Sequence, residues 1–216
     1  MIVKICGITR PEDAAAAARA GADWIGLNFW PRSKRFVTAD RVGELVRAAR
    51  DVREEIEVVG VFVDQELEEV LAAVKELALD YAQLHGDEPP AYAARLGERG
   101  IKAVGVSESS DLDRLAEYEC PLVLVDAPSP GRGGSGIVGD WRVARRAAAR
   151  RRVLLAGGLT PDNVAQAIAA VHPFGVDVAS GVEIAPGVKD PELMVRFVRE
   201  ARDADERGRS ARGERS

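Results

Sequence analysis

The sequence predicts a single-domain α/β protein with the (β/α)₈ architecture of a TIM barrel. Short β-branched or apolar runs alternate with amphipathic or alanine-rich stretches along almost the whole chain, and eight of each occur. The runs are apolar nearly throughout, which is typical of parallel strands covered on both faces. At 216 residues the chain is long enough for one sizeable core, and no internal domain boundary is visible.

The apolar runs define the expected strands, taken in chain order. The first is the run IVKIC, and the later ones are similarly rich in valine, isoleucine and leucine. The expected strands are residues 2–6, 23–29, 57–63, 81–85, 101–106, 122–126, 152–156 and 175–179.

The stretches between the strands predict helices, and some of them carry start signals. Asp190 precedes Pro191 in a capping arrangement, and Thr9 with Glu12 has capping-box spacing. The expected helices lie near residues 11–20, 39–50, 65–77, 89–98, 111–118, 140–150, 161–171 and 190–202.

A doubly wound open sheet is the alternative architecture. It usually has fewer strands and often begins with a G-x-G-x-x-G turn. The first turn here, Cys6-Gly7-Ile8-Thr9, does not match that pattern, so the barrel is favoured. We assign residues 1–202 to the barrel. Residues 203–216 are polar and rich in glycine, serine and arginine, and we expect them to be a disordered tail.

Composition restricts the partners. The net charge of −5 argues against nucleic acid, and no apolar run approaches the ~18 residues of a membrane helix. Two cysteines cannot build a disulfide framework, and the N-terminus lacks a signal-peptide pattern. We therefore expect a cytoplasmic protein, a monomer or a homodimer, with a small-molecule partner and no contact with nucleic acid or membrane.

A barrel places its active site at the C-terminal ends of the strands. Gly157 and Gly158 follow the seventh expected strand, and Ser180 and Gly181 follow the eighth. Glycine lets backbone N–H groups approach an anion closely, and loops after strands 7 and 8 are the usual phosphate site of barrels. We expect these residues to bind a phosphate group. The alternative is that the glycines only form tight turns.

Cys6 and Asp126 end strands three places apart around the ring and should face each other across the mouth of the barrel. A thiolate can accept a proton, and a protonated carboxyl group can donate one. Burial would raise the pKa of Asp126, and nearby cations would favour a Cys6 thiolate. The alternatives are a buried, inert cysteine and a carboxylate that caps a helix or forms a salt bridge.

Three further observations complete the candidate site. Arg35, in the loop after the second strand, could bind a substrate carboxylate in bidentate fashion, or could be a solvated surface charge. His85 could be an acid–base group, but more often such a histidine has a structural role. The two histidines and scattered carboxylates offer no metal-ligand spacing, so we expect no metal and no cofactor.

Eight segments occur in an order that points to one enzyme family. They are VKICGIT (3–9), GLNFWPRSKR (26–35), VGVFV (59–63), QLHGDE (83–88), LVLVDA (122–127), GGSG (133–136), LAGGLTPDNV (155–164) and DVASGVEIAPGVKD (177–190). Together these segments resemble phosphoribosylanthranilate isomerase of tryptophan biosynthesis. The loop segment 129–141 departs from the family pattern by its content of glycine and arginine, and we expect it to close over the site.

The resemblance implies a (β/α)₈ barrel that performs an Amadori rearrangement without cofactor or metal. Its phosphosugar substrate would be N-(5′-phosphoribosyl)anthranilate and its product 1-(2-carboxyphenylamino)-1-deoxyribulose 5-phosphate. Cys6 matches the general base of the family, Asp126 the general acid, and Arg35 the arginine that holds the anthranilate carboxylate. The segments Gly157-Gly158 and Ser180-Gly181 match the phosphate site.

Overall fold

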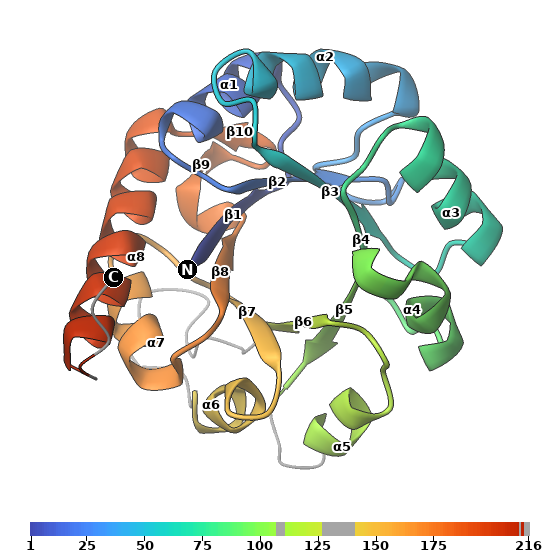
Figure 1. Cartoon of the computed structure of the whole chain (residues 1–216). Helices are drawn as coiled ribbons and strands as arrows, with labels where there is room; N and C mark the ends of the chain where they lie inside the picture. The colour runs from blue at the N-terminus through green and yellow to red at the C-terminus, as the bar shows by residue number, and fades with distance from the viewer. Residues whose placement is uncertain (107–110, 127–140, 212, 214–216) are drawn as a thin grey trace.

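Eight parallel strands form a closed ring in a computed structural model that describes residues 1–106, 111–126, 141–211 and 213. The strands pair in sequence order, and β8 closes the ring against β1, as Figure 1 shows from one end of the barrel. The predicted barrel is thus confirmed and the open sheet excluded. The strands are β1 (Ile2–Cys6), β2 (Trp24–Asn28), β3 (Glu57–Phe62), β4 (Tyr81–Leu84), β5 (Gly100–Gly105), β6 (Leu122–Asp126), β7 (Arg152–Ala156) and β8 (Gly175–Val178).

Helices surround the ring (Figure 1), each close to its predicted place. Between α4 and β5 lies the short helix η1 (Gly97–Arg99). None of the helices within the described ranges is long and apolar enough to span a membrane. The α-helices are α1 (Pro11–Arg19), α2 (Ala39–Arg50), α3 (Leu67–Glu76), α4 (Pro90–Leu96), α5 (Asp111–Ala116), α6 (Arg142–Ala148), α7 (Val164–Val171) and α8 (Pro191–Ala211).

Strand residues alternate between two cores because successive side chains point to opposite faces of a strand. One core lies between the strands and the helices and contains Val3 and Ile5 of β1. The other fills the interior of the barrel, where Ile2 packs against residues of the other strands. The residues with the parity of Ile2, namely Lys4 and Cys6, therefore lie on the inner side of β1. The inner core comprises Trp24, Val59, Ile101, Ala103, Leu122, Leu124, Leu154 and Ala156.

The two helix-start predictions had different outcomes. The Asp190 carboxylate accepts hydrogen bonds from the backbone N–H groups of Glu192 at 2.8 Å and Leu193 at 3.2 Å, so its capping role is confirmed. The capping box at Thr9 is wrong. The Thr9 hydroxyl instead donates a 2.6 Å hydrogen bond to the carbonyl of Gly187, and α1 begins at Pro11.

The expected disordered tail is wrong for residues 203–211, because α8 continues to Ala211. Ala204 is buried, and the Asp205 carboxylate accepts a 3.2 Å hydrogen bond from the amino group of Met1. Arg202 binds the carbonyl of Met1 and, at 2.6 Å, the carboxylate of Asp23. These polar residues therefore bind the start of the barrel, which the composition of the segment did not reveal. The rest of the tail, residues 212 and 214–216, lies outside the described residues, as do residues 127–140 of the loop expected to close over the site.

A small hairpin after β8 was not predicted. Ser180–Val182 form a 3₁₀ turn, η2, followed by β9 (Glu183–Ala185) and β10 (Val188–Lys189). The two strands are antiparallel and very short, so they carry little pattern that sequence could reveal. Figure 1 shows the hairpin beside β1 and β2, where it brings Glu183 and Lys189 next to the candidate site.

Candidate active site

A cavity of about 810 Å³ lies at the C-terminal ends of the strands. It contains all but one of the residues that the sequence singled out for chemistry or binding. Gly181 is the exception, and it directly follows the lining residue Ser180. The lining residues among those predictions are Cys6, Arg35, Asp126, Gly157, Gly158 and Ser180.

Cys6 and Asp126 lie at the ends of β1 and β6, three strands apart in the ring, and both line this cavity. Because the strands close into a ring in sequence order, Cys6 and Asp126 lie on opposite sides of the mouth of the barrel, as expected. Asp126 is in register with Gly105 of β5 and Ala156 of β7, so its backbone is held on both sides. The two side chains therefore border one ligand-sized space from different directions.

The Cys6 thiol is surrounded by competing charges. Burial raises the pKa of Cys6, and the Asp177 carboxylate adds to this rise. The ammonium groups of Lys4 and Lys189 act in the opposite direction but do not cancel it. The thiol form of Cys6 is therefore favoured near neutral pH. The ammonium groups of Lys4 and Lys189 lie close enough to stabilise a thiolate when one forms.

The segments after β7 and β8 are packed directly on each other. Gly157 and Gly158 have φ angles of 95° and 60°, a region that favours glycine. A Cβ atom on Gly181 would lie 1.9 Å from the carbonyl oxygen of Leu159, so only glycine allows this approach. The Asn163 side chain holds the same turn with two hydrogen bonds. Its Nδ2 donates to the carbonyl of Gly158 at 3.0 Å, and its Oδ1 accepts from the N–H of Thr160 at 2.8 Å. The glycines thus expose and immobilise backbone beside the cavity.

Arg35 is not a solvated surface charge. Its side chain is 25% exposed, and its Nε and Nη2 atoms donate to the Glu183 carboxylate at 2.8 and 2.6 Å. This bidentate bond uses one edge of the guanidinium group and raises the pKa of Arg35 further. The guanidinium group has a second edge, formed by Nη1 and the other hydrogen of Nη2. Because Arg35 lines the cavity, this edge can donate hydrogen bonds to a ligand there.

Glu183 and Lys189 belong to the site but were missed by the sequence reasoning. Lys189 is buried, and its ammonium group donates to the carbonyls of Cys6 at 2.6 Å and Ala179 at 3.0 Å and to Glu183 at 2.8 Å. Burial would raise the pKa of Glu183, but hydrogen bonds from Arg35 and Lys189 lower it. Two cations and one anion leave this cluster with a net positive charge beside the cavity.

A second group, which the sequence reasoning did not assign to the site, lies at the bottom of the cavity, where Gln83 and Asp177 are among the lining residues. Lys4, Gln83 and Asp177 are buried polar residues on β1, β4 and β8, and Lys4 bonds to both others at 2.9 Å. His85, at the end of β4, lines the cavity and bonds to Gln83 at 2.7 Å. A signal was available in the sequence, since Lys4 and Asp177 interrupt otherwise apolar strands and Lys4 shares the parity of Cys6.

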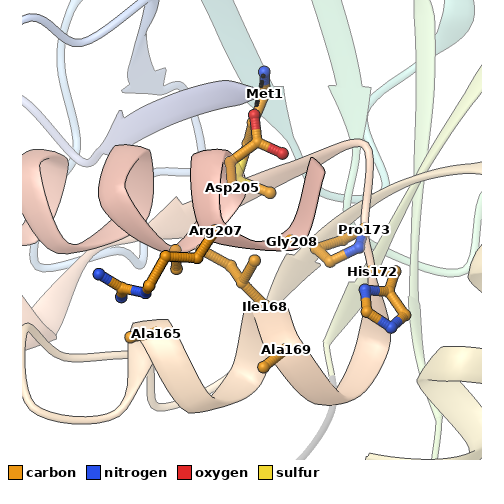
Figure 2. Close-up of a pocket in the computed structure, with 10 residues that line it drawn as sticks. Met1, Ala165, Ile168, Ala169, His172, Pro173, Asp205, Arg207 and Gly208 are labelled. Carbon is orange, nitrogen blue, oxygen red and sulfur yellow. Dashed lines mark hydrogen bonds and ion pairs between the residues drawn. The ribbon is translucent and has the colours of Figure 1, made fainter. Parts of the chain in front are cut away.

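Another cavity, of about 370 Å³, lies between α7 and α8 near the start of β1 (Figure 2). Its lining is largely apolar, and the Met1 amino group beside it is paired with Asp205. None of the predicted site residues lines it. Within the described part of the chain, no group of three or more His, Cys, Asp or Glu residues is arranged to hold a metal ion.

Comparison with known proteins gives the family. The family model described as N-(5′-phosphoribosyl)anthranilate isomerase matches residues 3–200. The chain belongs to this family. A curated isomerase of this name from Citrifermentans bemidjiense is 45% identical over 201 residues, covering 93% of this chain and 96% of the relative. One from Thermotoga neapolitana is 44% identical, covering 93% and 98%.

Solved structures of the isomerase family agree with the barrel. The Thermotoga maritima enzyme superposes with a TM-score of 0.83 at 41% identity, covering 94% of this chain and all of the other. A family structure in complex with reduced 1-(o-carboxyphenylamino)-1-deoxyribulose 5-phosphate gives a TM-score of 0.79 at 37% identity, with the same coverage. The chain is thus an isomerase of tryptophan biosynthesis with a (β/α)₈ fold.

Proposed function

We propose that the cavity at the strand ends converts N-(5′-phosphoribosyl)anthranilate to 1-(2-carboxyphenylamino)-1-deoxyribulose 5-phosphate by an Amadori rearrangement. The observation that carries the proposal is that a thiol, Cys6, and a carboxyl group, Asp126, border one cavity of about 810 Å³. The reduced form of this product is the ligand of a family structure. The reaction is an isomerisation in which C1′ is reduced and C2′ is oxidised within the same molecule, so it consumes no external redox partner.

Two anionic groups of the substrate match the two charged or dipolar regions of the cavity. The anthranilate carboxylate binds the remaining edge of the Arg35 guanidinium, which Glu183 holds in place. The phosphate binds the backbone N–H groups of Gly157, Gly158, Ser180 and Gly181. Fixing both groups places the sugar carbons between acid and base, which supplies the orientation needed for catalysis.

Ring opening is the first chemical step. Asp126 donates a proton to the furanose ring oxygen while the bond between that oxygen and C1′ breaks. The lone pair of the anthranilate nitrogen forms a double bond to C1′, so the intermediate is an iminium ion. Asp126 is left as a carboxylate, and the positive charge on the iminium acidifies the proton on C2′.

Proton removal from C2′ is the second step. The Cys6 thiolate takes this proton, and the electrons of the C–H bond form the C1′–C2′ double bond of a neutral enolamine. The enol hydroxyl at C2′ then loses its proton while C1′ gains one, which gives the ketone. The ammonium groups of Lys4 and Lys189 act on Cys6 to stabilise the thiolate required for this step.

The test uses freshly generated phosphoribosylanthranilate, whose fluorescence disappears on turnover. Cys6→Ala and Asp126→Asn should each lower kcat by ~10²-fold or more while the fold is retained by circular dichroism. Chelator should leave the rate of the unmodified enzyme unchanged. A near-normal kcat in either variant would remove that residue from its role, and loss of activity with chelator would contradict the metal-free mechanism.

A further inference from the structure

A buried charge lies beneath the cavity, in the middle of the barrel. Lys4 has no exposed surface, and it reaches from β1 to Asp177 on the neighbouring β8 and to Gln83 on β4, which lies across the ring. Burying a paired charge gives little or no stability compared with an apolar layer. The position of Lys4 directly below the catalytic cavity therefore suggests a role other than packing.

The hydrogen bonds from Lys4 to Gln83 and from Gln83 to His85 have a fixed direction. An ammonium group can only donate, so the atom of Gln83 that faces Lys4 at 2.9 Å is the carbonyl oxygen Oε1. The amide NH₂ group then faces Nδ1 of His85 at 2.7 Å. An NH₂ group also can only donate, so Nδ1 must be the unprotonated acceptor. The proton of the neutral ring is therefore on Nε2.

The charge state of His85 follows from the same surroundings. Burial lowers the pKa of His85, and the positive charges of Lys4 and Lys102 lower it further. The carboxylates of Asp126 and Asp177 raise it, but the net shift of the pKa is downward. A second ring proton would have to sit on Nδ1, against the NH₂ group of Gln83. His85 is thus a neutral ring with one donor, Nε2–H, in the cavity that it lines together with Asp126.

We propose that Lys4 is a positioning residue that acts through Gln83 to hold His85 as the neutral Nε2–H tautomer. In this state His85 donates one hydrogen bond to an oxygen of the bound phosphosugar and takes no part in proton transfer, which leaves Cys6 and Asp126 as the acid–base pair. The assignment of the tautomer stands on the hydrogen bonds alone. Its use in catalysis rests on the proposed function.

The tautomer of His85 can be measured by NMR, because the chain contains only one other histidine whose signals must be removed. ¹⁵N-histidine labelling with a His172→Gln variant assigns the signals of His85. The unmodified enzyme should show an unprotonated Nδ1 and a protonated Nε2 at neutral pH, and the ring should become doubly protonated only below its ordinary pKa. A protonated Nδ1, or a ring that titrates near its ordinary pKa of about 6.5, would overturn the proposal whatever the activity of the enzyme.

Two variants test the dependence on Lys4. Lys4→Met removes the group that orients the amide, so both tautomers of His85 should appear, and KM should rise about tenfold from the loss of one hydrogen bond. Its kcat should fall as well, because the variant also lacks one of the two cations that stabilise the Cys6 thiolate. Lys102→Met is the matched control, because Lys102 is equally buried and paired with Glu88 but does not touch Gln83. It should keep the single tautomer. The same mixture of tautomers in both variants would show a merely structural role.

Gln83→Glu supplies the same test without removing a buried charge, and it decides the matter if Lys4→Met does not fold. The carboxylate still accepts from Lys4 but cannot donate to His85. Nδ1 of His85 should therefore become protonated, and KM should again rise about tenfold. An Nδ1 that stays unprotonated in folded Gln83→Glu would refute the hydrogen-bond direction.

Discussion

The contact between Gly181 and the loop after β7 allows a quantitative prediction for Gly181→Ala. The new Cβ atom would lie 1.9 Å from the carbonyl oxygen of Leu159, about 1.5 Å short of the 3.4 Å at which ordinary contact begins. The nearby atoms are backbone, so no side chain can rotate away, and the two loops must separate. Leu159 lines the cavity, so this displacement moves the proposed phosphate site itself.

The size of the effect follows from that displacement. A shift of about 1 Å in a group that positions substrate costs roughly 10²-fold in catalytic efficiency. We expect kcat/KM of Gly181→Ala to fall by about that factor, mainly through KM. The same variant should bind inorganic phosphate more weakly as a competitive inhibitor. Overpacking of this kind lowers the free energy of unfolding by about 1–3 kcal/mol, so the variant should melt earlier but still fold.

The assay compares KM, the inhibition constant of phosphate and the melting temperature with those of Gly43→Ala. Gly43 lies in α2, and a Cβ atom there would meet nothing within 4 Å. That control should keep wild-type kinetics and gain roughly 0.5–1 kcal/mol of stability. If folded Gly181→Ala bound substrate and phosphate within twofold of the unmodified enzyme, the packing of the two loops would not determine the phosphate site.

Three further predictions concern other parts of the structure. Glu183→Gln should raise KM about tenfold with little change in kcat, because Arg35 loses its charged partner; an unchanged KM would show that Arg35 needs no such support. Asp126 must be protonated while Cys6 is a thiolate, and a carboxyl group titrates below a thiol, so kcat/KM of the unmodified enzyme should be flat around neutral pH and fall only above the ordinary thiol pKa of about 8.5, because burial raises the pKa of Cys6; a fall that begins below pH 8 would contradict the raised pKa. Asp190→Ala should lower the free energy of unfolding by about 1 kcal/mol in thermal melts and leave KM unchanged, since it removes the cap of α8.

The residues proposed for acid–base chemistry and phosphate binding were accessible to sequence reasoning because the barrel rule converts chain position into spatial position. Cys6, Asp126 and the glycines each follow a recognisable apolar run. Glu183 was not accessible, because it lies in a hairpin too short to carry a pattern, and its role depends on Arg35, 148 residues away in the chain. The helical part of the tail was missed for a related reason: its Asp205 carboxylate binds the amino group of Met1, at the opposite end of the chain.

Sequence by itself determined the order of strands and helices, because apolar periodicity is a local property that each segment carries independently. It also determined, to within one residue, where each strand ends. Only the tertiary structure decided which buried polar side chains form ion pairs and hydrogen bonds with one another inside the barrel. Lys4, Gln83 and Asp177 come from three strands that meet only when the ring closes, and the direction of their hydrogen bonds depends on all three at once. Such long-range pairing leaves no periodic trace in the chain.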